Sequence, residues 1–168
     1  DIRFKYDFDT AIGEFGLRYN GSYTDTLYQV PTGQFNIINE YKSSGVVPAY
    51  VNISGFGDLL NIDGNYDEKH SLKLLWKKNS WGGSFSALKK GGFIQSSLTR
   101  SDGTEYEIPS MTTMNAAIYH NFKMGGNSAR VKFSVKNFTD ERAPIADRFF
   151  GFYAYAHQDY GRHYYMSL

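Results

Sequence analysis

The sequence predicts an all-β fold, an antiparallel sheet that forms a segment of a transmembrane β-barrel. Several stretches alternate apolar and polar side chains residue by residue, which is typical of strands whose two faces meet different surroundings. Aromatic residues make up 17% of the 168 residues, with 14 Tyr and 13 Phe, while the mean hydropathy stays polar at −0.48. Short and long connections follow one another along the chain, as they do in outer-membrane barrels.

Composition excludes several classes of function. The net charge of +1 argues against nucleic acid as the main partner. Cysteine is absent, which excludes disulfides and thiolate chemistry. No stretch approaches the roughly 20 apolar residues of a spanning helix, so a membrane role would have to use strands. Because the sequence begins at Asp1 without a leader, we expect either a mature protein or a piece of a longer one.

The first two strands are predicted at residues 2–9 and 15–28. The first places Ile2, Phe4, Tyr6 and Phe8 on one face and charged residues on the other. A short turn separates the two stretches, so they form a hairpin. Residues 30 to about 67 are rich in Gly, Asn and Ser and contain two prolines, which predicts a long irregular loop; loops of this length are usually functional.

Two further strands are expected at residues 70–78 and 84–93. The second alternates less regularly, because Lys89 has the same parity as Phe85 and Ala87. This position would require a β-bulge or a place near the membrane edge. A loop of medium length is expected at about 99–109.

The last three strands are predicted at residues 113–123, 128–137 and 160–168. The stretch 128–137 is the most regular, and its cations share one face. A glycine-containing turn joins it to the strand before, and a long loop at about 139–159 leads to the strand after. The resulting seven strands are joined alternately by tight turns and long loops. An open sheet in lipid would leave backbone groups unpaired at its edges, so these strands predict part of a larger barrel.

The last sixty residues resemble a known family. The segment "VKNFTDERAP", an aromatic loop and "YGRHYYMSL" are similar to the C-terminal end of TonB-dependent outer-membrane receptors. In that family the penultimate strand closes on a segment like Asn137 to Asp140, and the final strand begins with a pair like Gly161 and Arg162. The family usually continues a few residues beyond Leu168 to a terminal aromatic. Upstream of about Ser110 the likeness is only architectural.

The resemblance implies that residues 1–168 are the C-terminal part of a barrel domain, the last seven strands of 22. The plug domain, the earlier strands and the N-terminal region that contacts TonB would lie outside this sequence. The implied function is the import of a scarce nutrient, such as an iron chelate, cobalamin or an oligosaccharide, across the outer membrane of a Gram-negative bacterium. The implied partners are outer-membrane lipid, the rest of the barrel with its plug, TonB and the cargo.

Two sets of residues are candidates for a functional site. Exposed aromatics in a loop often mark recognition, and the candidates for cargo contact are Arg148, Phe149, Phe150, Phe152, Tyr153, Tyr155 and His157. Packing of this loop against its neighbours is the alternative. Basic residues of the polar stripe would face the barrel lumen, where they could guide an anionic cargo or hold a plug; the alternative is that they are simply solvated and paired with nearby carboxylates. They are Arg3, Lys5, Arg18, Lys73, Arg130, Lys132 and Lys136. The rings of Tyr6, Tyr23 and Tyr165 are expected in interfacial girdles.

No motif indicates an enzyme, a metal site or a bound cofactor. The four histidines lack a metal-binding spacing, and "DGNYDE" lacks the glycine and the glutamate of a calcium loop. No nucleophile elbow or phosphate-binding loop is present. Two alternatives to the receptor remain open. One is a passive porin-like barrel, and the other is a soluble carbohydrate-binding β-sandwich with aromatic loops.

Overall fold

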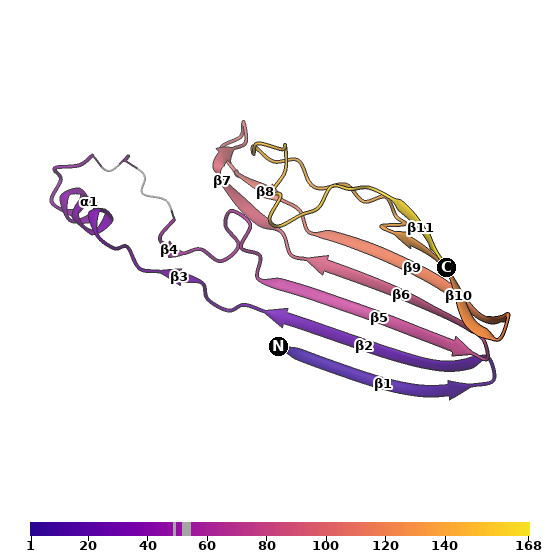
Figure 1. The fold of residues 1–168 in the computed structure, drawn as a ribbon. Helices are drawn as coiled ribbons and strands as arrows, with labels where there is room; N and C mark the ends of the chain where they lie inside the picture. Colours follow the sequence, from indigo (N-terminus) through magenta and orange to yellow (C-terminus); the bar gives the residue numbers. More distant parts are fainter. Residues whose placement is uncertain (49, 52–54) are drawn as a thin grey trace.

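The structure, a computed structural model, describes residues 1–48, 50–51 and 55–168. One seven-stranded antiparallel sheet dominates it, in the order β1-β2-β5-β6-β9-β10-β11 (Figure 1). The all-β prediction is confirmed. The strands are β1 (Ile2–Thr10), β2 (Gly13–Tyr23), β5 (Glu68–Lys78), β6 (Trp81–Lys90), β9 (Met111–Met124), β10 (Asn127–Lys136) and β11 (His163–Ser167). Among the described residues, no helix is long and apolar enough to cross a membrane.

The register of the sheet separates an apolar face from a polar face. Phe15 lies opposite Phe8 on one side and Trp76 on the other, while Arg18 lies opposite Lys5 and Lys73. This separation continues through β10 because every main-sheet pairing is regular and side chains alternate between faces. The large side chains of the apolar face are exposed or partly exposed, and no described element packs over them. Examples are Phe4 at 50%, Ile118 at 46% and Phe133 at 47% exposure.

Connections of different length lie at opposite ends of the sheet, as predicted. Two-residue turns join β1 to β2, β5 to β6 and β9 to β10 at one end, called here the short-turn rim. The three long connections leave from the other end, the long-loop rim; the β7–β8 hairpin and the last connection lie next to each other there, and α1 extends away from them (Figure 1). Because successive strands of the sheet are antiparallel, alternate connections lie at opposite ends. Short and long connections alternate along the chain, so each kind is collected at one end.

The first long connection is more ordered than the sequence predicts. It contains the short pair β3 (Tyr28–Gln29) and β4 (Gly57–Asp58) and the helix α1 (Gln34–Ser43), so the expectation of an irregular loop over 30–67 is wrong for this part. The helix was missed because its start has no capping side chain, its first turn has no acidic residue, and it buries nothing. Residue 49 and residues 52–54 of the predicted loop lie outside the described residues.

The second long connection is also a correction. The strand expected at 84–93 ends at Lys90, and β7 (Phe93–Thr99) pairs with β8 (Glu105–Ile108) as a separate hairpin. The loop predicted at 99–109 is therefore largely a strand and its turn. Two glycines after Lys90 allow the chain to leave the main sheet, since the backbone of Ile108 lies too close to Gly92 for a side chain there.

The structure answers the question of Lys89 without a bulge. Lys89 lies opposite His70 and Thr112 in unbroken register, close to the end of β6. Its ammonium lies 2.6 Å from the carboxylate of Glu68 at the start of the neighbouring strand. The charges of the apolar face therefore sit at its two ends, with Glu68 and Lys89 at the long-loop rim and Lys78, opposite Trp81, at the short-turn rim.

Tyr165 does not occupy the apolar face on which an interfacial girdle was expected. It lies opposite Ser134 and under the ammonium of Lys136, 5.0 Å from the ring centre, so it belongs to the polar face. The reason is its parity, since Tyr164 and Met166 take the apolar face of the same strand.

The only buried hydrophobic cluster of the described residues lies above the sheet, among the long connections. It joins Phe93 and Ile108 of the β7–β8 hairpin to Ala146, Tyr153 and Ala156 of the last connection. We call this assembly the loop layer: residues 59–67, β7, β8 and residues 145–157. Among the described elements, nothing packs on the main sheet as a second layer, and its packing is between neighbouring strands.

Candidate functional site

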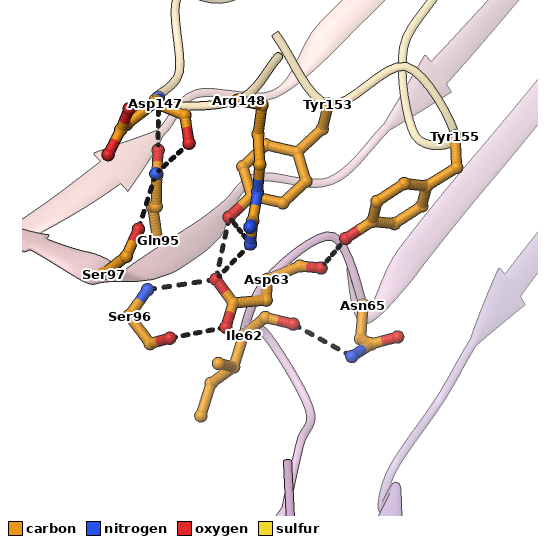
Figure 2. Close-up of polar contacts among 10 residues, drawn as sticks. All are labelled: Ile62, Asp63, Asn65, Gln95, Ser96, Ser97, Asp147, Arg148, Tyr153 and Tyr155. Carbon is orange, nitrogen blue, oxygen red and sulfur yellow. Dashed lines mark hydrogen bonds and ion pairs between the residues drawn. The ribbon is translucent and has the colours of Figure 1, made fainter. Parts of the chain in front are cut away.

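Asp63 joins three segments of the loop layer. Its carboxylate accepts hydrogen bonds from the amide and hydroxyl of Ser96, at 3.1 and 2.5 Å, and from the Tyr153 hydroxyl at 2.7 Å. The guanidinium of Arg148 lies 3.3 Å away, and the Tyr155 hydroxyl donates to the Asp63 carbonyl (Figure 2). Residues from the first, second and third long connections therefore meet at one carboxylate.

These contacts shift the ionisation of the groups involved. Burial alone would raise the pKa of Asp63, but the hydrogen bonds from Ser96 and Tyr153 and the charge of Arg148 together lower it. Burial and the adjacent Asp63 carboxylate raise the pKa of Tyr153 to about 12. Asp63 is therefore an anion and Tyr153 a neutral donor at neutral pH, and the cluster has the protonation states that its hydrogen bonds require.

A second polar contact fixes the other side of the last connection. The side chain of Gln95, which is fully buried, donates to the carbonyl of Asp147 and accepts from its amide, each at 3.1 Å (Figure 2). Its amide also donates to Ser97 at 2.8 Å. A buried amide with these partners fixes the backbone of the loop in one position, because breaking the bonds would leave polar atoms unsatisfied.

Between these two anchors, residues 146–151 form a closed turn that presents aromatic rings to solvent. The amide of Ala146 donates to the carbonyl of Gly151 at 2.8 Å, and Gly151 has a φ of 77°. Phe149 is 96% exposed and Phe150 is 67% exposed, with their ring centres 4.9 Å apart. The pair is therefore held on a rigid turn without being packed against the described part of the protein.

The seven residues predicted for cargo contact thus fall into two groups. Phe149, Phe150 and Tyr155 are exposed at the surface of the loop layer, and Phe152 and Arg148 are partly exposed. Tyr153 and His157 are each only 1% exposed and lie in its interior. Tyr153 and His157 therefore pack against their neighbours, which was the alternative to cargo contact. Contact with a cargo stays a prediction for all seven residues.

His157 is the unusual buried residue of the layer. Its ring stacks on Phe93, with centres 5.7 Å apart and planes 13° apart, and neither ring nitrogen has a protein hydrogen-bond partner. Burial, together with the nearby charge of Lys90, lowers the pKa of His157. The imidazole is therefore neutral at neutral pH and acts as a flat packing group.

The base of the last connection contains the motif that resembles the receptor family. Asn137, with a φ of 49°, bonds the amide and the carbonyl of Glu141 through its side chain, at 3.0 and 2.7 Å. Asp140 accepts from the amide of Arg162 at 2.8 Å. Arg142 contacts both carboxylate oxygens of Asp159, at 2.7 and 2.5 Å, and lowers the pKa of Asp159 to about 2. These contacts hold the start of the connection against its end.

The polar face of the main sheet carries the second candidate set. All seven predicted basic residues share this face by register. Arg130 stacks over the ring of Tyr119 at 4.4 Å and donates to Asn121 at 2.7 Å, and Lys132 lies opposite Tyr119.

The described residues contain no group of three His, Cys, Asp or Glu that could hold a metal ion. Their arrangement suits recognition by charge and by aromatic contact. Comparison with known proteins found no matching family, no similar curated protein and no similar solved structure. The functional argument therefore rests on the geometry of the chain itself.

Sequence reasoning missed the two residues that organise the loop layer, Asp63 and Gln95. Asp63 was considered only as the start of a calcium loop, and Gln95 fell between the strand predicted at 84–93 and the loop predicted at about 99–109. A signal was present for Asp63, because an Asp-Gly pair inside a long connection marks a specific turn. Nothing local marked Gln95, since its role depends on a residue 52 positions away.

Proposed function

We propose that the chain is part of an outer-membrane β-barrel of the TonB-dependent receptor type, which imports a nutrient. The observation that carries the proposal is the uncovered apolar face of a sheet whose other face is charged. Hydrocarbon is the surrounding that such a face fits, because burying exposed apolar area of this extent is favourable and no described residue does it. The apolar face would contact lipid and the polar face would line a wet interior.

Strand length supports the same conclusion. Six of the seven main-sheet strands have between 9 and 14 residues, while β11 has 5, and a tilted strand needs about 9 to 11 to cross a bilayer. The outer edges of β1 and β11 have no partner strand in the described structure. In lipid such edges would cost several kcal/mol per unpaired group, so the sheet would be completed by further strands of a larger barrel.

The two alternatives make different demands on the structure. A soluble sandwich would need a second layer on the apolar face, which the described residues do not provide. A porin-like channel fits the sheet equally well and differs from a receptor in lacking energy coupling. The motif at Asn137 to Asp140 and at Arg162 favours the receptor by resemblance.

The test uses the full-length protein expressed in a Gram-negative host that lacks it. We expect the protein in the outer-membrane fraction, running faster on a gel before boiling than after it. Uptake of labelled cobalamin, ferric citrate and maltoheptaose would be measured with and without an uncoupler. A receptor raises uptake of a probe only when the proton gradient is intact. Uptake unaffected by the uncoupler would indicate a passive channel, and a protein found in the soluble fraction would overturn the proposal.

The aromatic turn gives a prediction at the level of cargo recognition. We expect Phe149→Ser with Phe150→Ser to lower uptake of the active probe by about tenfold, as loss of an aromatic anchor does in other interfaces. Assembly should be unchanged, because both rings are exposed. Ile12→Ser is the matched control, an apolar residue 64% exposed at the short-turn rim. Unchanged uptake in the double variant would remove the turn from the account of recognition.

A further inference from the structure

Cations lie directly opposite one another on the polar face, in the half nearer the long-loop rim. Arg18 faces Lys5 on one side and Lys73 on the other, and Lys69 faces Lys90. Like charges in directly opposed positions of a sheet destabilise it. The arrangement therefore has an electrostatic cost that the sheet alone does not require.

Cations predominate in this half of the polar face. The row formed by Lys5, Arg18, Lys73 and Ser86 bounds this half of the polar face, and the structure describes every strand residue in this half. From that row to the long-loop rim, the polar face has no carboxylate on any of the seven strands. Its cations are Arg3, Lys5, Arg18, Lys69, Lys73, Lys90 and Lys136. The strand carboxylates of the face, those of Asp7, Asp9 and Glu14, all lie nearer the short-turn rim, and Asp1, just before β1, adds one carboxylate at the other end.

Some of these cations have partners within the protein. The Asp7 carboxylate lies 2.6 Å from Arg18 and 3.7 Å from Lys5, and Lys90 donates to the carbonyl of Ala156. Lys136 lies over the ring of Tyr165. Within the described part of the chain, the other three cations make no ion pair. They are Arg3, Lys69 and Lys73.

Two of these three line a hollow of about 590 Å³ in the polar face. Arg3 and Lys69 stand at its wall together with the side chains of Asn20 and Ser71, and Lys73 follows in the next row along β5. Asp1 and Ser22 also line it, with the Ser22 hydroxyl donating to the Asp1 carboxylate at 2.7 Å. Guanidinium, ammonium, amide and hydroxyl donors in one hollow match the oxygen atoms of an anion.

We propose that this hollow binds the carboxylate or phosphate group of a small anionic ligand. The bound anion would neutralise cations that otherwise repel one another, which explains why they lie together with only the carboxylate of Asp1 beside them. The inference rests on the proposed barrel, since there the polar face is the wall of a water-filled interior open to small molecules. The charged group of the ligand would lie against β1, β2 and β5.

The test is calorimetric titration of the full-length protein in detergent at low salt, with inorganic tripolyphosphate and with citrate as probes. Binding of tripolyphosphate alone would assign a phosphate site, and binding of citrate would assign a carboxylate site. In the variant with Arg3→Gln, Lys69→Gln and Lys73→Gln, we expect the affinity to fall by about tenfold or more. The control with Lys77→Gln, Lys123→Gln and Lys132→Gln removes the same charge from the same face near the short-turn rim, and should change the affinity less than about twofold, because none of these lysines lines the hollow.

The stability of each protein gives a second readout, which also reveals a variant that fails to fold. Tripolyphosphate should raise the urea midpoint of the wild-type protein and of the control, and leave that of the hollow variant unchanged. Equal weakening in both variants, or no binding by the wild type, would overturn the inference. A protein that inserts into the outer membrane but binds neither probe would refute only this inference, whereas a soluble protein would refute the proposed function.

Discussion

At the scale of single residues, the loop layer depends on groups whose partners come from distant parts of the chain. Asp63 and Tyr153 are 90 positions apart, and Gln95 and Asp147 are 52 apart. Both contacts are partly buried. Leaving a buried polar group without a hydrogen bond costs more free energy than a formed hydrogen bond contributes. The exposed rings of Phe149 and Phe150 are held in place by contacts of the buried residues Gln95 and Tyr153.

Asp63→Asn tests the centre of this arrangement. The amide keeps the size of the side chain but removes the charge beside Arg148 and one acceptor oxygen. We expect the loop layer to lose about 1 to 3 kcal/mol, seen as faster hydrogen exchange at the amides of Ala156 and His157, which donate to the Tyr153 carbonyl. Asp102→Asn is the control, since Asp102 bonds only Thr104 in its own turn. Equal exchange in wild type and Asp63→Asn would contradict this role.

His157 predicts a pH dependence of the same layer. Its pKa is lowered in the folded state, so the unfolded layer binds more protons below the ordinary pKa of 6.5. Stability from this residue is therefore present above that pH and is lost as the pH falls through it. Proteolytic cleavage within 145–157 should be faster at about pH 5 than at about pH 8.

The substitution His157→Phe keeps a flat ring against Phe93 and removes the titrating group. We expect it to abolish most of the difference between the two pH values, while His163→Phe, at the start of β11, should leave the difference in place. A wild-type layer cleaved at the same rate at both values would show that burial of His157 does not control its stability.

At the scale of elements, the hairpins of the main sheet depend on glycines at the short-turn rim. Gly13 opens β2 with a φ of 132°, and a Cβ there would lie 2.5 Å from the carbonyl oxygen of Lys77. Gly13→Ala therefore adds a backbone collision to conformational strain. We expect a loss of about 2 kcal/mol or more in urea unfolding, because strain alone costs about 1 to 2 kcal/mol.

Gly126→Ala separates the two contributions. Gly126 has a φ of 87° in the β9–β10 turn, but no atom lies within 4 Å of the added Cβ. The variant should lose only the strain term. If Gly13→Ala were no more destabilising than Gly126→Ala, the close approach of β5 to this turn would not contribute to the hairpin.

Elements with strong alternation could be predicted from the sequence, and those with weak local signals could not. The stretch 128–137 became β10 nearly residue for residue, because one strand face is apolar throughout. The helix α1 has no such face and no cap, and β7 with β8 is stabilised by burial of Phe93 and Ile108 against a distant loop. The aromatic loop was visible in the composition, but the anchors that orient it arise only in the folded chain.

At the scale of the whole molecule, charge and apolar area are sorted into separate regions. The three long connections, residues 24–67, 91–110 and 137–162, contain 12 acidic and 5 basic residues. Of the 17 acidic and 18 basic residues in the chain, the remaining 5 and 13 lie in the rest, which is mainly the main sheet and its turns. The net charge of +1 is therefore the sum of acidic connections at the long-loop rim and a basic main sheet. In a barrel, this would place an acidic entrance above a basic wall.

The central claim is that the apolar face of the main sheet contacts lipid while the polar face contacts water. Val131 and Lys132 are adjacent in β10 and point to opposite faces. The chain has no cysteine of its own, so Val131→Cys and Lys132→Cys each introduce one labelling site into this segment. Their spin labels form a matched pair that differs only in the face of the sheet.

The most direct measurement is the collision rate of each spin label with oxygen, which concentrates in lipid, and with a water-soluble nickel complex, in the full-length protein reconstituted in vesicles. The account predicts that the label at 131 collides mainly with oxygen and the label at 132 mainly with nickel. Protection of position 131 from both reagents would place the apolar face against protein, as in a soluble sandwich. Access of nickel to both positions would likewise contradict the account.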